Sequence, residues 1–253
     1  MERRFHCTAC GKCCFGWLPL TLDDAIANAG RFPLAMVWTA VRQGAKSFAL
    51  TGRLGTTVTL RTKKKIAAQI APTAYIPPSL PCPELTAEGL CAIHAEKPLR
   101  CRTMPFFPYR DENDQGEMLV PRKDWLCDTS DAAPVVYRDK SLVERGDFDR
   151  ERDALLGQAP ILRAYAERLL TTAPNVATAL EKAAKKPRGG QVVLNFTAIL
   201  SRLTDVDVVD FARRQHPVLE DFAEKVEGTD APAEYARYYR ESAAAMARFL
   251  EAR

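Results

Sequence analysis

The chain has 253 residues, of which 47% are hydrophobic and 27% charged, and a formal net charge of +4. That length allows one large domain or two modest ones with a buried core. No apolar run reaches the roughly 18 residues of a membrane-spanning helix, and so small an excess of positive charge does not indicate a nucleic-acid-binding protein. We therefore expect a globular protein that is not a membrane protein and does not bind nucleic acid.

The eight cysteines are the most unevenly placed residues, because all of them lie in the first 127 positions. The excess positive charge also lies in residues 1–130. The first apolar stretch, residues 15–20, is short and is followed by Asp23 and Asp24, so we expect no signal peptide and a cytoplasmic location. Thiols stay reduced in that compartment, which argues against a disulfide framework.

The N-terminal half is expected to contain short elements separated by prolines. Thr21 and the acidic residues after it resemble a helix start, and a second helix is expected over residues 34–42. Alternating β-branched residues at 57–62 predict one of two or three short strands within residues 47–76. Prolines place Cys82 on an irregular loop, a helical turn is expected within residues 91–98, and residues 118–121 are expected to form an edge strand.

Residues 131–253 are predicted to be mainly helical. Apolar residues recur there at spacings of three and four over residues 150–170, 174–186, 206–226 and 232–251. Residues 191–200 fit a strand or a helix equally well. The sequence thus predicts an α+β fold. A small, irregular, cysteine-rich half with short strands, residues 1–130, precedes a mainly helical half, residues 131–253, and whether the second half packs on the first stays open.

Four cysteines fall within eight positions, at Cys7, Cys10, Cys13 and Cys14. Unliganded buried cysteines and disulfides are alternatives, but metal or cluster ligation explains such close spacing better. Two-residue spacers let successive thiolates converge on one centre, as C-x2-C does in zinc knuckles and C-x2-C-x2-C in four-iron clusters. Cys7, Cys10 and Cys13 therefore fit one centre.

Cys14 is predicted to serve a different centre, since neighbouring side chains diverge by about 100° on a helix and point to opposite faces of a strand. The remaining ligands are Cys82, Cys91, Cys101 and Cys127, one of which completes the first set. The eight cysteines then divide into two sets of four. Because Cys13 and Cys14 are consecutive, with Cα atoms about 3.8 Å apart, the two centres would lie close together. Alternatively, only part of the set binds metal and one thiol stays free for redox or covalent chemistry.

Thiolates suit iron–sulfur clusters and zinc alike, but three close thiolates with one remote favour one or two 4Fe-4S clusters. The negative charge that thiolates leave on such centres is expected to be offset by the nearby basic residues Arg4, Lys12, Arg100 and Arg102. His6 and His94 are candidate ligands as well, although with eight thiols present a hydrogen-bonding or structural role is the simpler interpretation.

Three blocks of the sequence resemble a known bacterial group, the CxxCxxCC cysteine-cluster family of zinc- or iron-chelating domains. The blocks are residues 5–14 (FHCTACGKCC), 80–85 (LPCPEL) and 91–106 (CAIHAEKPLRCRTMPF), and the resemblance covers about residues 5–130. It implies a metal-chelating domain. One enzymatic branch with a related cysteine cluster, the flagellin lysine methylases, favours iron–sulfur. His94 stands where relatives commonly have Tyr, and the resemblance does not extend to the helical half.

These observations favour an iron–sulfur protein with a redox or electron-transfer role and a protein redox partner, in which the eight cysteines are ligands of one or two centres. A zinc-binding structural or interaction module without catalysis is the alternative. A role in lysine methylation would need a methyl donor, for which the chain has no Gly-rich nucleotide motif. The sequence contains neither a Ser-His-Asp order nor a G-x-S-x-G motif, so it does not indicate a hydrolase. Whether the protein is an enzyme stays open.

Overall fold

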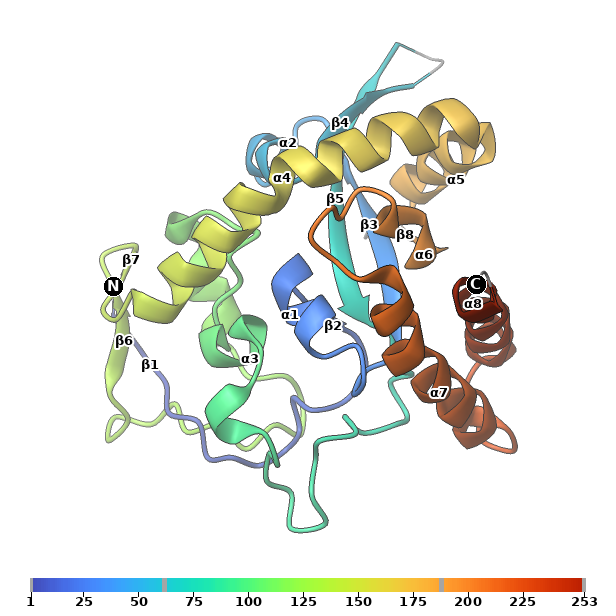
Figure 1. The fold of residues 1–253 in the computed structure, drawn as a ribbon. Helices are drawn as coiled ribbons and strands as arrows, with labels where there is room; N and C mark the ends of the chain where they lie inside the picture. The colour runs from blue at the N-terminus through green and yellow to red at the C-terminus, as the bar shows by residue number, and fades with distance from the viewer. Residues whose placement is uncertain (1, 61–62, 187–188, 252–253) are drawn as a thin grey trace.

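Two long strands form the centre of the molecule, as the computed structural model of residues 2–60, 63–186 and 189–251 shows (Figure 1). β3 (Leu34–Arg42) and β5 (Lys65–Ala74) pair antiparallel along their length. β2 (Leu18–Pro19) and β4 (Thr56–Thr59) pair with β5, and β8 (Gln191–Asn195) pairs with β3. The resulting antiparallel sheet has the order β2-β5-β3-β8, with β4 also on β5.

The prediction of a helix over residues 34–42 is wrong, because this segment is strand β3. β3 pairs on both edges, with β5 and β8, and Leu34, Met36 and Trp38 are each fully buried. A strand that is buried on both faces carries a continuous apolar run in place of the alternation of a half-exposed strand. Periodicity alone cannot distinguish such a run from a buried helix. Val37, Thr39 and Val41 are the β-branched signals for a strand.

The remaining differences from the prediction lie in short segments. α2 (Phe48–Leu54) is a helix within residues 47–76, for which only strands are expected. The alternating strand expected at 57–62 is β4, and residues 61 and 62 lie outside the described residues. The edge strand expected at 118–121 is absent from the described residues, and the 3-10 helix η2 (Glu112–Leu119) occupies part of that segment. The buried Gln115 side chain fixes η2, because it bonds the backbone N–H and C=O of Phe107.

The long helices of the C-terminal half are those that the apolar periodicity predicts. They are α4 (Gly146–Thr172), α5 (Pro174–Lys185), α7 (Val208–Val226) and α8 (Ala233–Glu251). Residues 191–200, ambiguous in the sequence, divide into β8 and the short helix α6 (Thr197–Leu200). α7 begins after Asp207, whose side chain accepts hydrogen bonds from the backbone N–H groups of Val209 and Asp210 and so caps the helix. The α+β fold class is confirmed.

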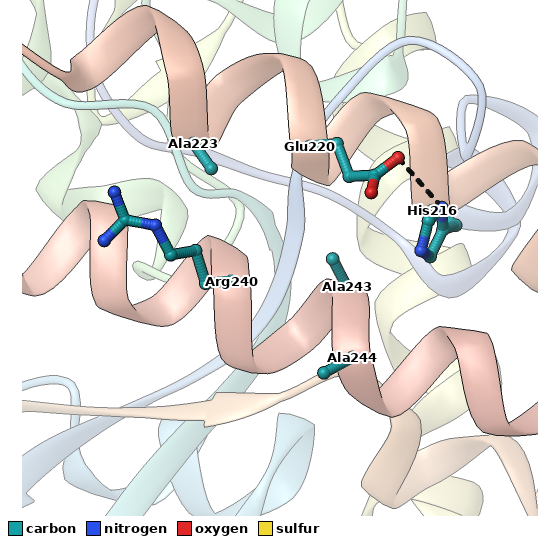
Figure 2. A pocket seen from close by; sticks show the side chains of 6 residues that line it. All are labelled: His216, Glu220, Ala223, Arg240, Ala243 and Ala244. Atoms are coloured by element: carbon teal, nitrogen blue, oxygen red, sulfur yellow. Dashed lines mark ion pairs between the residues drawn. The ribbon is translucent and has the colours of Figure 1, made fainter.

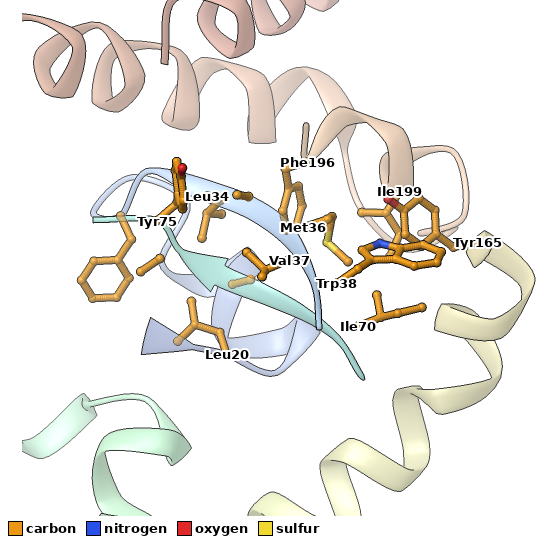
Figure 3. Close-up of a cluster of buried hydrophobic side chains, with 14 of the residues drawn as sticks. Leu20, Leu34, Met36, Val37, Trp38, Ile70, Tyr75, Tyr165, Phe196 and Ile199 are labelled. Atoms are coloured by element: carbon orange, nitrogen blue, oxygen red, sulfur yellow. The ribbon is translucent and has the colours of Figure 1, made fainter. Parts of the chain in front are cut away.

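One hydrophobic core joins residues from both halves of the chain (Figure 3). Trp38 of β3 packs edge-on against Tyr165 of α4, with 5.7 Å between ring centroids. Phe196 stacks on Phe211 of α7 at 5.1 Å. The same core includes residues of β5, α5 and α8. The division of the chain at residue 130 stays a prediction, and the sheet itself takes β8 from the second half.

Aromatic side chains pack where α8 meets the end of β5. Tyr75 stacks on Tyr235 of α8 at 4.5 Å between ring centroids, and Tyr238 packs edge-on against Tyr75 at 4.9 Å. Trp17 contacts the same group, because its indole N–H donates to the Tyr235 hydroxyl at 2.7 Å. These contacts fix the segment that follows the first cysteines against the last helix of the chain.

The cysteine-containing segments lie outside the central sheet. A small sheet of β1 (Glu2–Arg4), β6 (Val135–Arg138) and β7 (Ser141–Leu142) flanks them. They run mostly as loops, drawn below α1 and α3 in Figure 1, with the 3-10 helix η1 (His94–Glu96) at the expected helical turn and α3 (Leu99–Thr103) beside α4. In the ranges that the structure describes, no helix combines the length and apolar character that crossing a membrane requires.

Candidate metal centre

A tight turn shapes the first cysteine segment. The backbone N–H of Cys14 donates to the carbonyl of Gly11 at 3.0 Å, and Gly11 has a φ of +69°. A Cβ at this position would lie 3.1 Å from the carbonyl oxygen of Gly89 and 3.3 Å from the Leu85 side chain. Glycine is therefore required both for the left-handed backbone and for the close approach of the loop at residues 85–89.

A short antiparallel pairing brings Cys7 beside Cys127. The backbone N–H of His6 donates to the carbonyl of Asp128 at 2.8 Å, and the reverse bond measures 3.0 Å. In this antiparallel register the residue after His6 lies opposite the residue before Asp128, so Cys7 faces Cys127. The Thr8 hydroxyl donates to the carbonyl of Leu126 at 3.0 Å and extends the contact.

The proline-rich loop places Cys82 and Cys91 next to Cys14. The backbone N–H of Cys82 donates to the carbonyl of Cys14 at 2.7 Å. Leu85 forms an isolated antiparallel bridge with Cys91, and a turn bond from the N–H of Leu85 to the carbonyl of Cys82 measures 3.0 Å. The backbone pairs thus connect Cys14 to Cys82 and Cys82 to Cys91. Cys82 lies on an irregular loop, as predicted.

Cys101 lies on α3, a helix of only five residues. The carboxylate of Asp24, at the start of α1 (Leu22–Ala27), accepts the backbone N–H of Leu99 at 3.1 Å. Thr103 donates its hydroxyl to the carbonyl of Asp147 in α4 at 3.3 Å. α3 is therefore held between α1 and α4.

Four of the thiols interact electrostatically as one group, namely Cys14, Cys82, Cys91 and Cys101. Burial raises the pKa of the Cys101 thiol to about 12, and the charges of Cys82, Cys13 and Cys91 act in the same direction. Burial also raises the pKa of Cys82 to about 11, with the charge of Cys91 contributing. Charges of like sign disfavour ionisation of one another over roughly 10 Å, so these four thiols share one region of the molecule.

A second group of interacting thiols consists of Cys7, Cys10, Cys13 and Cys127. Burial raises the pKa of Cys127, and so do the charges of Cys10, Cys7 and Cys13. The pKa of Cys10 is lowered, first by a hydrogen bond from the backbone N–H of Lys12. Lowering the pKa of a thiol favours the thiolate, which is the form that binds metal.

The two groups meet at the adjacent pair Cys13 and Cys14, whose side chains hydrogen-bond to each other. That bond raises the pKa of Cys13 and lowers the pKa of Cys14. Neighbouring side chains diverge on a regular helix or strand, but these two residues follow the turn at Gly11, where the backbone is neither. Cys13 also interacts with Cys82 and Cys101, so it lies between the groups.

All eight cysteines are free thiols. Within residues 2–60, 63–186 and 189–251, no three or more His, Cys, Asp or Glu side chains are positioned to hold a metal ion as they stand. The donor set nevertheless fits a thiolate-bound metal, because two groups of interacting sulfurs are gathered from four segments and soft thiolates select zinc and iron–sulfur clusters. Ligation would require the side chains of exposed residues such as Cys7 and Cys13 to close around the metal.

The four predicted basic residues have three kinds of surroundings. Arg4 and Arg102 use their guanidinium groups on backbone carbonyls, Arg4 on Ala133 at 2.7 Å and Arg102 on Lys97 at 2.9 Å. Lys12 is exposed beside the cysteines. Arg100 is buried and forms an ion pair with Glu151 of α4, a residue that sequence reasoning misses because nothing in its surrounding sequence relates it to the cysteines.

The two histidines considered as ligands are both exposed. His6 takes part in the site through its backbone, by the pairing with Asp128, and His94 begins η1. Neither position adds to the two groups of interacting thiols. Among the candidate ligands, the cysteines are therefore the residues that form interacting groups.

A separate hollow lies between α7 and α8, far from the cysteines in the sequence. Its volume is about 270 Å³, and Figure 2 shows its lining residues His216, Glu220, Ala223, Arg240, Ala243 and Ala244. His216 Nδ1 lies 3.2 Å from Glu220 Oε2. Arg240 pairs with Glu227. No cysteine lines this hollow, and its charged groups already have partners.

A family comparison identifies the cysteine-containing part of the chain. Residues 6–127 match the family model CxxCxxCC, described as "Putative zinc- or iron-chelating domain". Searches of curated proteins and of solved structures return no match. The matched range begins just before Cys7 and ends at Cys127, so it contains both groups of thiols. Over residues 6–127, just under half of its length, the chain therefore matches the CxxCxxCC family of zinc- or iron-chelating domains.

Proposed function

We propose that the cysteines hold two iron–sulfur clusters and that the protein transfers electrons. Cys7, Cys10, Cys13 and Cys127 would ligate one centre, and Cys14, Cys82, Cys91 and Cys101 the other. The observation that carries the proposal is the backbone pairing, which sets Cys7 opposite Cys127 and brings Cys82 against Cys14. Each group then supplies the four thiolates that a 4Fe-4S cluster takes.

The ligand spacing favours iron over zinc in the first centre. Cys7, Cys10 and Cys13 have the C-x2-C-x2-C spacing with one remote partner, which is common for four-iron clusters. A bound cluster would supply one-electron transfer. The chain's own contribution is to exclude water from part of the site and to donate backbone N–H groups, as Lys12 does to the Cys10 sulfur.

Electron transfer requires a partner, which we propose to be a redox protein in a compartment that keeps thiols reduced, such as the cytoplasm. Because Cys13 and Cys14 touch, two centres built on them would lie side by side. Close centres suit transfer from one cluster to the other. Because the Cys7 and Cys13 thiols are exposed, the first centre would lie nearer to the surface than the second.

A zinc-binding structural module is the second candidate function. The family description supports it by naming zinc or iron. The ligand loops also have little regular secondary structure, and binding of zinc would contribute free energy to their folding. Tetrahedral four-cysteine zinc sites need the same donors as the clusters. The ligand assignment is therefore the same in both candidates, and the metal distinguishes them.

Metal and sulfide analysis of protein purified without oxygen tests the proposal. Two four-iron clusters predict about eight iron and eight acid-labile sulfide per chain, with a brown colour. About two zinc ions and no sulfide would support the zinc module instead. A chain that retains neither metal after purification and after reconstitution with iron and sulfide or with zinc would contradict both candidates.

A further inference from the structure

An ion pair is buried where α3 meets α4. Arg100 Nη1 lies 3.3 Å from Glu151 Oε1, and each side chain is 3% exposed. Arg100 precedes Cys101 in α3. Glu151 lies near the start of α4, outside the range that matches the family. The pair therefore joins the helical half of the chain to a segment that carries a candidate ligand.

Arg100 also ties the turn after α3 to the same place. Its Nη2 donates to the carbonyl of Phe106, and its guanidinium lies over the Phe107 ring, 5.4 Å from the centroid. A helix as short as α3 is not stable without such tertiary contacts. Successive residues of a helix diverge by about 100°, so Arg100 faces α4 while Cys101 interacts with the thiols of Cys82, Cys13 and Cys91.

Stability alone is a poor explanation for this pair. Arg100 Nε and Glu151 Oε2 are buried, and in the described part of the chain neither has a hydrogen-bond partner. Burying two charges with incomplete hydrogen bonding often costs more free energy than apolar side chains of similar volume would. The pair does fix the orientation of the Arg100 side chain, because its guanidinium contacts the Glu151 carboxylate and the Phe106 carbonyl at the same time.

We infer that Glu151 is a positioning residue, which acts through Arg100 to fix Cys101 among the ligands of the second centre. This inference rests on the proposed function, and it holds for clusters and for zinc. It makes α4 a structural part of the metal site, although α4 carries no cysteine. Residues that orient metal ligands typically change metal affinity 10- to 100-fold when they are replaced, so a fold-change of about that size is expected.

The test measures the rate of metal release to a strong chelator from full-length protein purified without oxygen. The Cys127→Ser background retains only the second centre, and the Cys91→Ser background retains only the first. Glu151→Gln removes the charge with little change of shape. It should speed release about 10-fold or more in the Cys127→Ser background, and leave the rate unchanged in the Cys91→Ser background.

Controls separate positioning from a general loss of stability. Glu167→Gln makes the same change at an exposed position of α4 and should leave both rates unchanged. Leu162→Ala destabilises α4 in the main core, away from α3, and should affect both backgrounds alike. Arg100→Met combined with Glu151→Leu should keep the fold, because apolar residues replace the pair, and still release metal faster from the second centre.

The outcomes distinguish the inference from the function on which it rests. Equal release with and without Glu151→Gln in the Cys127→Ser background would overturn the inference, and so would acceleration of both centres to the same extent. Wild-type release from the Arg100→Met, Glu151→Leu protein would overturn it too. If the unmodified chain holds no metal, or the Cys127→Ser chain holds none, the two-centre function fails and the inference fails with it.

Discussion

At the scale of single residues, two features of the structure require glycine at position 11. Its φ of +69° costs a residue with a Cβ about 1–2 kcal/mol, and the Cβ would also meet the Gly89 carbonyl at 3.1 Å. We expect Gly11→Ala to lower the unfolding free energy by at least that amount and to lower metal content as well. Chemical denaturation and metal analysis measure the two effects.

Gly228→Ala is the matched control for Gly11→Ala. Gly228 has a φ of +74°, and no atom lies within 4 Å of its added Cβ. It should show the backbone cost alone, with unchanged metal content. If Gly11→Ala keeps full metal content, the approach of the loop at residues 85–89 does not matter for the site.

The grouping of thiols predicts which ligands are lost together. Replacing Cys127 by Ser should remove the centre of Cys7, Cys10 and Cys13 and leave the other. Replacing Cys91 by Ser should do the reverse. Each variant is expected to retain about half of the wild-type metal, and the double variant none. Metal analysis of the three proteins checks this, and a Cys127→Ser chain that loses all its metal would contradict the grouping.

Residue types and spacing were enough to propose eight candidate ligands and to assign Cys14 to a different centre from Cys7, Cys10 and Cys13, but not to say which remote cysteine joins which centre. Nothing along the chain relates Cys127 to Cys7, because their contact arises from the pairing of His6 with Asp128. Glu151 is invisible for the same reason, since its partner Arg100 lies 51 positions away and in the other half of the chain. Tertiary contacts of this kind leave no periodic signal.

At the scale of elements, one side chain joins α7 to the start of β3. Gln215 is fully buried, its Oε1 accepts the backbone N–H of Leu34 at 3.0 Å, and its Nε2 donates to the carbonyls of Ala29 and Phe32. Gln215→Leu leaves these three backbone groups without that partner. Because each unsatisfied buried group costs about 1–3 kcal/mol, we expect a loss of about 3 kcal/mol or more in unfolding free energy.

Urea denaturation measures the loss at Gln215, as a lower midpoint with an unchanged slope. Gln43→Leu is the control, because Gln43 is exposed on the turn after β3. It should change the unfolding free energy by no more than about 0.5 kcal/mol. Equal effects of the two variants would show that the Gln215 side chain does not hold β3 in place.

The elements that sequence periodicity predicts well are those with one buried face. α7 and α8 each alternate buried and exposed positions with the period of a helix, and they lie where expected. β3 is buried on both faces and gives no such alternation. η2 depends on the side chain of Gln115, which bonds backbone groups of Phe107 and Arg110, so its conformation is set by a single residue.

At the scale of the whole molecule, the main core and the candidate metal site lie in different parts. The core contains residues of β3, β5 and the long helices, and Cys82 is the cysteine that packs against it. We therefore expect metal removal to leave the central sheet folded. Amide hydrogen exchange should show continued protection in β3, β5 and α7 and faster exchange in residues 5–17 and 80–130.

The control for metal removal is the chain with all eight cysteines replaced by serine, which should show the same exchange pattern without any chelator. A loss of protection throughout the sheet in either protein would mean that the core depends on the bound metal. It would also mean that residues 131–253 do not fold without the site.

The three tryptophans report on different parts of this arrangement. Trp125 lies two positions before Cys127, with Arg122 over its ring at 5.3 Å, while Trp17 follows Cys14 and donates to Tyr235. Trp38 is fully buried in the sheet. Intrinsic fluorescence therefore carries its own internal reference: loading of either centre should quench the emission of the indole beside it, while the signal from Trp38 follows unfolding alone.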